Sequence, residues 1–121
     1  MTRRVFTSEH NATDSLHDQR LAAIAAAKEA QIQLVDLNAA SLAYVNAIGK
    51  EAAQTFNLKS GDMTHLNPHG EMVFARMVAD LIIGHPPTIG AGDDWTPSGC
   101  LANWFVRNQT LSRDIWRGVL V

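Results

Sequence analysis

Three observations predict an α/β fold for this chain of 121 residues. Residues 31–37 form a short run rich in branched side chains between two segments of helical character, which is typical of a buried strand in a parallel sheet. Residues 71–83 carry a wide apolar helical face that needs a sheet to pack on. A sheet usually contains several strands, whereas only one is clear here. We therefore expect a mostly helical chain whose remaining apolar surface is covered by a missing N-terminal portion or by another chain.

The segment before that strand divides into a turn and a helix. Residues 7–14 are polar and turn-like. Residues 14–29 are alanine-rich with apolar side chains near helical spacing, and they predict a helix. Asp14 is either the N-cap of this helix or a solvated loop residue. The order helix, strand, helix supports the α/β class.

Two helices are predicted after the strand. Residues 38–49 begin with Asn38, a capping residue type, and end near Gly49, which suits a helix of modest length. Residues 50–56 predict a further short helix. It leads into a turn-rich loop.

That loop, residues 61–70, holds the strongest candidate for a chemical site. Asp62 and His65 lie three residues apart, so the carboxylate can fold back to one ring nitrogen of the imidazole. Such a pair suits general acid–base catalysis but needs a nucleophile. Without one, His65 is instead a loop residue capping the helix that begins near Pro68. We expect Thr64 and Asn67 to satisfy backbone groups of the turn and Gly70 to be a close-packing or turn residue.

Residues 85–121 differ in character from the preceding chain. His85 and two prolines stop the helix over 71–83, and several glycines follow. We expect a divergent or irregular tail, which is either a natural extension whose aromatic residues cover exposed apolar surface or a product of altered splicing or reading frame with no packing partner. Trp95, Trp104 and Phe105 could form a sugar-stacking platform or serve as cover.

The order of motifs over about residues 3–84 resembles the C-terminal third of SGNH (GDSL-type) esterases, in particular the fungal rhamnogalacturonan acetylesterases. The likeness is carried by the Asp-x-x-His motif of Asp62 and His65, by Gly70 and the helix after it, and by upstream segments at residues 3–6, 20–29, 34–38 and 44–49. The Gly-Asp-Ser block, the oxyanion-hole glycine block and the Gly-x-Asn-Asp block of that family do not occur in this chain.

The resemblance implies a specific function and fold. Residues 1–84 would be the C-terminal portion of a three-layer α/β/α, flavodoxin-like SGNH domain. Asp62 and His65 would be two members of a catalytic triad whose serine lies outside this chain. The substrate would be an acetylated polysaccharide of the pectin type, the protein would be extracellular, and no metal or organic cofactor would be needed.

Two other interpretations of the same residues stay open. Asp62, His65 and His69 are a candidate set of ligands for a divalent metal, although Pro68 between the histidines works against convergence of their rings. In the second interpretation the chain is a non-catalytic helical interaction module that binds a protein partner through exposed apolar faces.

Composition limits the remaining possibilities. A net charge of −2, with scattered rather than clustered cations, argues against nucleic-acid binding. Arg3 and Arg4 could meet an acidic sugar polymer but are expected to form a solvated charged terminus. Cys100 is the single cysteine, so no intrachain disulfide is possible. The sequence shows no phosphate-binding loop, no signal-peptide pattern and no membrane span. We expect His10, His17 and His85 to be surface residues without a carboxylate partner.

Overall fold

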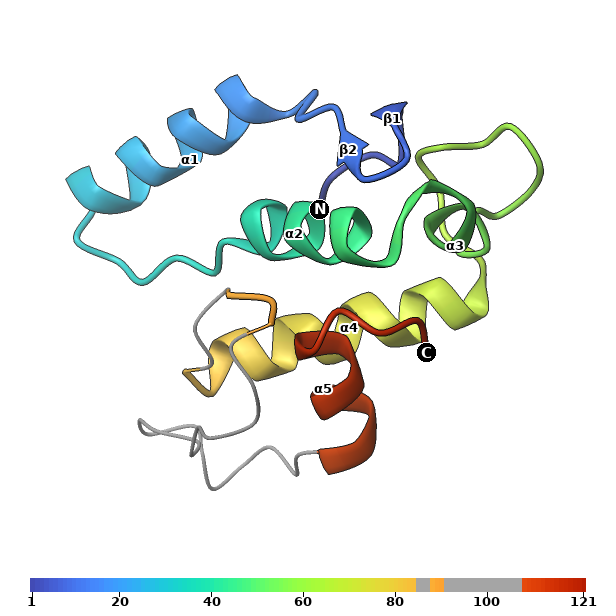
Figure 1. Cartoon of the computed structure of the whole chain (residues 1–121). Coiled ribbons are helices and arrows are strands. Elements are labelled where there is room, and N and C mark those ends of the chain that lie inside the picture. Colours follow the sequence, from blue (N-terminus) through green and yellow to red (C-terminus); the bar gives the residue numbers. More distant parts are fainter. Residues whose placement is uncertain (85–87, 91–107) are drawn as a thin grey trace.

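The computed structural model describes residues 1–84, 88–90 and 108–121. Within these residues the chain forms a small, mostly helical domain of mixed α/β type, with five helices and one two-stranded sheet (Figure 1). The α/β class is confirmed in this coarse sense. The elements in chain order are β1 (Phe6–Ser8), β2 (Asn11–Ala12), α1 (His17–Glu29), α2 (Leu37–Ile48), α3 (Lys50–Gln54), α4 (Pro68–Ile82) and α5 (Gln109–Trp116).

The sheet differs from the prediction in both position and direction. Strands β1 and β2 pair antiparallel, with Phe6 opposite Ala12 and Ser8 opposite Asn11, in a region expected to be turn-like. The strand predicted over 31–37 is wrong, because residues 31–36 are irregular and Leu37 already belongs to α2. Ile32 is 65% exposed. A parallel strand needs hydrogen-bonded neighbours, and no neighbouring strand lies beside this segment in the described part of the chain.

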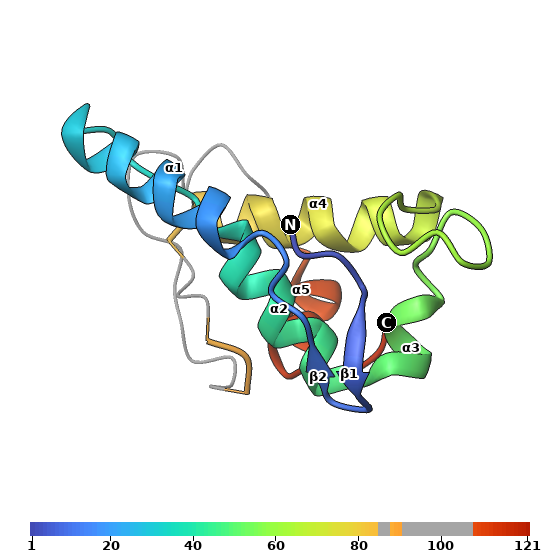
Figure 2. The same ribbon diagram turned by 90° about the horizontal axis from the view of Figure 1, so that it is seen from above.

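Helix α1 projects from the rest of the domain (Figure 2). It begins three residues later than predicted, and Leu16 occupies the N-cap position without a side-chain cap. Asp14 is therefore not the cap, and its carboxylate accepts a hydrogen bond from Asn38 Nδ2 at 2.9 Å instead. Ala27 is the one buried residue of the helix, so α1 makes little contact with the core.

Helix α2 starts at an aspartate rather than at the predicted cap. Oδ1 of Asp36 accepts a hydrogen bond from the backbone N–H of Ala39 at 3.0 Å, so the N-cap is two residues before Asn38. The same carboxylate accepts two hydrogen bonds from Arg20 Nε on α1, at 2.8 and 2.9 Å. These bonds tie α1 to the start of α2. Helix α3 forms inside the predicted segment 50–56.

The core lies where α2, α3, α4 and α5 meet. Tyr44 of α2, Phe56 and Phe74 of α4 form an aromatic cluster, with ring centroids 5.7 to 6.3 Å apart. Two of the three ring pairs meet edge to face, an arrangement that aromatic rings favour. The other members of the buried apolar cluster are Ala12, Ala40, Val45, Ala53, Val73, Met77, Ile115 and Trp116.

Helix α4 confirms the apolar helix predicted after the loop, including its start near Pro68. Oδ1 of Asn67 accepts from the backbone N–H of Gly70 at 2.8 Å, so Asn67 rather than His65 is the cap. Gly70 is confirmed as a close-packing residue, since a Cβ there would lie 2.9 Å from Cβ of Phe56. Proline in the first turn suits such a start.

The tail is not irregular throughout. Residues 109–116 form helix α5, which packs against α4 (Figure 1). Trp116 is buried, and its Nε1–H donates to Oδ2 of Asp80 on α4 at 2.9 Å. This part of the tail thus has a packing partner in the same core as residues 37–83. The aromatic residues Trp95, Trp104 and Phe105, together with His85 and Cys100, lie outside the described residues.

None of the helices described is both long enough and apolar enough to cross a membrane.

Candidate acid–base site on the loop before α4

The loop between α3 and α4 is closed by backbone pairing at its base. Asn57 and Leu66 form an isolated antiparallel bridge. The backbone N–H of Leu58 donates to the carbonyl of His65 at 3.0 Å, and that of Asn67 donates to the carbonyl of Phe56 at 3.0 Å. At the far end Gly61 has a φ of +81°, a conformation that side chains with a Cβ rarely adopt. The loop is therefore a small hairpin-like structure directly in front of α4.

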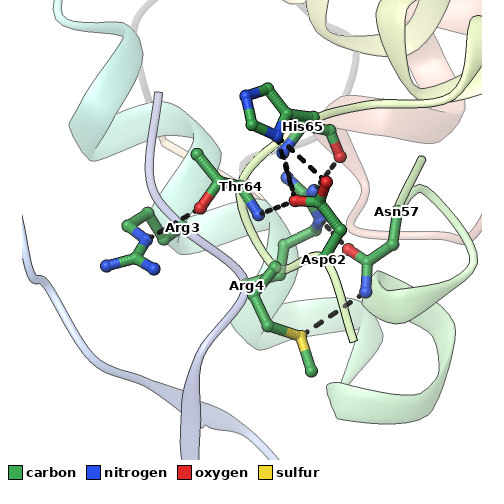
Figure 3. Close-up of polar contacts among 7 residues, drawn as sticks. Arg3, Arg4, Asn57, Asp62, Thr64 and His65 are labelled. Carbon is green, nitrogen blue, oxygen red and sulfur yellow. Dashed lines mark hydrogen bonds and ion pairs between the residues drawn. The ribbon is translucent and has the colours of Figure 1, made fainter. Parts of the chain in front are cut away.

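The loop brings together the two residues predicted as catalytic. Nδ1 of His65 lies 3.0 Å from Oδ2 and 3.2 Å from Oδ1 of Asp62 (Figure 3). The His65 side chain is 72% exposed and that of Asp62 15% exposed. Because a carboxylate accepts, Nδ1 carries the proton in this arrangement and Nε2 is left as a proton acceptor open to solvent. This is the geometry of a general base with its orienting acid.

Asp62 is also fixed by the backbone. Its Oδ1 accepts from the N–H of His65 at 2.9 Å and from the N–H of Thr64 at 3.1 Å. These two backbone donors, followed by the His65 ring, lower the pKa of Asp62 to about 2. Asp62 is consequently ionised at neutral pH, and its carboxylate can accept the Nδ1–H of His65.

Beneath this pair lies a buried cation that the sequence did not lead us to expect. Arg4 was predicted to be part of a solvated terminus, and that prediction is wrong, because Arg4 is 0% exposed. Its Nε donates to Oδ1 of Asn57 at 2.5 Å and its Nη2 donates to the carbonyl of His65 at 2.7 Å (Figure 3). A buried charge without such acceptors would cost several kcal/mol, on the order of 3–5. The His65 carbonyl and the side-chain oxygen of Asn57 supply two such acceptors to the Arg4 guanidinium.

Arg3 lies on the opposite, solvent-exposed side of the N-terminal segment. Its Nε donates to Oγ1 of Thr64 at 3.1 Å. Arg3 and Lys59 line a shallow open depression together with the loop residues from Ser60 to His65. The prediction that Asn67 satisfies backbone groups of the turn is confirmed, since its amide caps α4 and also donates to the carbonyl of Thr55. The same prediction for Thr64 is not borne out, because its hydroxyl accepts from the Arg3 side chain and its own N–H donates to Asp62.

The structure does not assemble the alternative metal set. His69 lies on α4 with its ring 5.6 Å from that of Phe56, and its Nε2 is 2.6 Å from a backbone oxygen of Val121. Its ring is thus engaged away from Asp62 and His65. No group of three metal-ligating side chains occurs among residues 1–84, 88–90 and 108–121.

Sequence reasoning missed a second aspartate–histidine pair. Nδ1 of His17 lies 3.4 Å from Oδ2 of Asp14, so the prediction that His17 lacks a carboxylate partner is wrong. The signal was present, because Asp14 and His17 have the same spacing of three as Asp62 and His65. The contact is longer, and the hydrogen bond from Asn38 is the main reason that the pKa of Asp14 is lowered. His10 has a different partner, since its Nδ1 lies 2.7 Å from the carbonyl of Asn46.

Fold and site together define a small, mainly helical α/β domain that presents an exposed Asp–His pair on a loop tied to the N-terminal segment. Comparison of this chain with protein-family models, with curated proteins and with solved structures found no match.

Proposed function

We propose that Asp62 and His65 supply the general base and its orienting carboxylate for ester hydrolysis of the SGNH type, within a protein that provides the serine nucleophile from outside this chain. The observation that carries the proposal is the contact of 3.0 Å between His65 Nδ1 and Asp62 Oδ2, which leaves Nε2 exposed. The resemblance of the Asp-x-x-His loop and the following helix to SGNH esterases adds the reaction class.

The proposed roles of the residues are those of a catalytic triad of the SGNH type. Nε2 of His65 takes the proton of the serine hydroxyl as its oxygen forms a bond to the ester carbonyl carbon. Asp62 keeps the proton on Nδ1 and stabilises the imidazolium that results. His65 then returns the proton to the departing alcohol as the carbon–oxygen bond breaks. In the second half, His65 takes a proton from water as the water oxygen bonds to the acyl carbon. It then gives that proton to the serine oxygen as the bond between the serine and the acyl carbon breaks, and the acid is released.

The substrate class rests on the resemblance. By that likeness it is an O-acetylated polysaccharide of the pectin type, and the protein acts outside the cell. In the same proposal residues 1–84 belong to a three-layer α/β/α domain. Its sheet would then cover the segment 31–36, whose apolar side chains Ile32, Leu34 and Val35 are exposed in this chain.

A hydrolysis assay tests the proposal. The chain is joined to an SGNH-type N-terminal portion carrying the Gly-Asp-Ser block, and release of p-nitrophenol from p-nitrophenyl acetate is followed. We expect activity only in the joined protein, with a loss of at least about 100-fold in kcat for His65→Ala, the range typical of a general base. His17→Ala is the matched control, since it removes the other imidazole paired to an aspartate three residues earlier, and it should leave the rate unchanged.

One observation favours a second candidate function, the non-catalytic interaction module. Leu21 on α1 and the segment 31–36 expose apolar side chains, and Leu34 is 44% exposed. A hollow of about 250 Å³ between α1 and the start of α2 is lined on its apolar side by Leu16, Ala23, Leu34, Val35 and Leu37. A joined protein that folds well but hydrolyses no acetyl ester would sink the esterase proposal and favour this function.

A further inference from the structure

The N-terminal segment runs from the core to the Asp62–His65 loop. At one end the backbone N–H of Thr2 donates to Oγ of Ser41 on α2 at 2.8 Å, and both residues are buried. At the other end the backbone N–H of Arg4 donates to the carbonyl of Met63 at 3.0 Å. The loop is therefore attached to α2 through a short stretch of chain in which Thr2 and Arg4 are buried.

Arg4 contacts the loop at three points. Besides its backbone bond to Met63, the guanidinium binds the Asn57 side chain on one strand of the loop and the His65 carbonyl on the other. A guanidinium presents its donors in a fixed planar fork, so it can hold two acceptors at once in a set geometry. Its Nη1 has no hydrogen-bond partner among the described residues.

These bonds restrain His65 at both of its backbone groups. Its N–H donates to Asp62 Oδ1 at 2.9 Å, and its carbonyl accepts from both Arg4 Nη2 at 2.7 Å and Leu58 N–H at 3.0 Å. With the backbone fixed, only the two side-chain torsions remain to be set, and the Asp62 carboxylate sets them through Nδ1. The orientation of the imidazole ring thus depends on Asp62, which contacts the ring, and also on Arg4 and Leu58, which contact only the His65 carbonyl.

We infer that Arg4 is a positioning residue, which holds the backbone of His65 so that the ring keeps its Nδ1–H on Asp62 and offers Nε2 to a proton donor. The inference deepens the proposed function and rests on it for the catalytic meaning of this orientation. Burial lowers the pKa of Arg4, and the negative charge of Asp62 offsets part of this lowering, which agrees with the position of the guanidinium beside the loop.

Nitrogen NMR of the His65 ring tests this role without any enzymatic activity. At a pH where the imidazole is neutral, the ring shifts report which nitrogen carries the proton. In the wild-type chain we expect the Nδ1–H form to dominate. Arg4→Met should shift His65 toward a mixture of the two forms, with loss of the ring-proton signal held by Asp62. Arg4→Lys, which keeps the charge without the fork, should retain part of the preference.

Arg3→Met is the matched control. It removes the neighbouring arginine, whose side chain is bonded to the Thr64 hydroxyl rather than to His65, and it should leave the ring unchanged. If Arg4→Met fails to fold, Asn57→Ala takes its place, since it removes one acceptor of the fork and should produce a smaller shift in the same direction. Far-UV circular dichroism shows whether each variant is folded.

A folded Arg4→Met or Asn57→Ala protein with the wild-type proportion of Nδ1–H overturns the inference, even if the joined enzyme is active. If the proportion of the Nδ1–H form of His65 changes but the joined protein hydrolyses no ester, the role of Arg4 is supported. Only the esterase proposal is then refuted. In an active joined enzyme, a fall in kcat with KM unchanged for Arg4→Met supports the inference, because a group that orients the base acts on the chemical step.

Discussion

Trp116→Phe tests whether the described part of the tail belongs to the folded domain. The indole Nε1–H donates to Asp80 Oδ2 at 2.9 Å, and both residues are buried. Asp80 also pairs with Arg76 through Oδ1, 2.8 Å from Nη2, so the indole and the guanidinium contact different oxygens of the carboxyl group. Phenylalanine keeps an aromatic ring but has no N–H. Losing a hydrogen bond to a buried charged group costs about 1.5–3 kcal/mol. For a chain of this length, we expect the melting temperature to fall by about 5–15 °C.

Thermal and urea unfolding followed by far-UV circular dichroism measure this loss, since tryptophan fluorescence itself changes in the variant. Met72→Ala on α4 is the control, because Met72 is 51% exposed and surface substitutions usually change the unfolding free energy by at most about 0.5 kcal/mol. Equal midpoints for Trp116→Phe and the wild type would refute the reasoning that α5 is docked on α4 through Asp80.

Three further outcomes follow from single residues. Gly70→Ala should lower the unfolding free energy by about 1–3 kcal/mol in urea titrations, because the new Cβ meets side-chain and backbone atoms of Phe56 within 3.0 Å; a more stable variant would contradict this. Asp36→Ala should cost about 1–2 kcal/mol by the same measurement, through loss of the α2 cap and of the Arg20 pair, and should loosen α1 first. The Asp62 carboxylate should titrate near pH 2 by carbon NMR. Its folded pKa lies below the unfolded value of about 3.9, so its stabilisation is complete above about pH 4 and is lost as the pH falls toward 2. A midpoint near 4 would rule out its backbone hydrogen bonds.

The helices α1 to α4 were the predictable part of the fold because their signals are local, whereas α5 in the tail was not predicted. The apolar face over 71–83 and the proline and asparagine before it are enough to indicate α4 and its start. The strand at 31–37 could not be judged in the same way. Branched side chains favour a strand, but a strand forms only when a neighbour supplies its hydrogen bonds, and that information lies outside the segment. Here Asp36 caps α2 instead, and the residues before it stay irregular.

The candidate site shows the same division between local and distant information. The Asp62–His65 contact was predictable from a spacing of three within one loop. The burial of Arg4 was not, because it depends on the Asn57 amide and the His65 carbonyl, which are 53 and 61 positions away in the sequence. The pair of Asp14 and His17 could have been predicted from the same spacing of three, but Asp14 was considered only as an N-cap or a solvated loop residue.

The projecting helix α1 has a consequence for how this domain opens. Ala27 is its single buried residue, and the Arg20–Asp36 contact joins it to the start of α2, whereas the aromatic cluster draws on α2, α4 and Phe56. Helix α1 can therefore unwind without disturbing the core, as a unit of low local stability. Its amides should exchange with solvent well before those of α2 and α4. A protease should cut the exposed segment 31–36 first, leaving the Asp62–His65 loop in a body that is still folded.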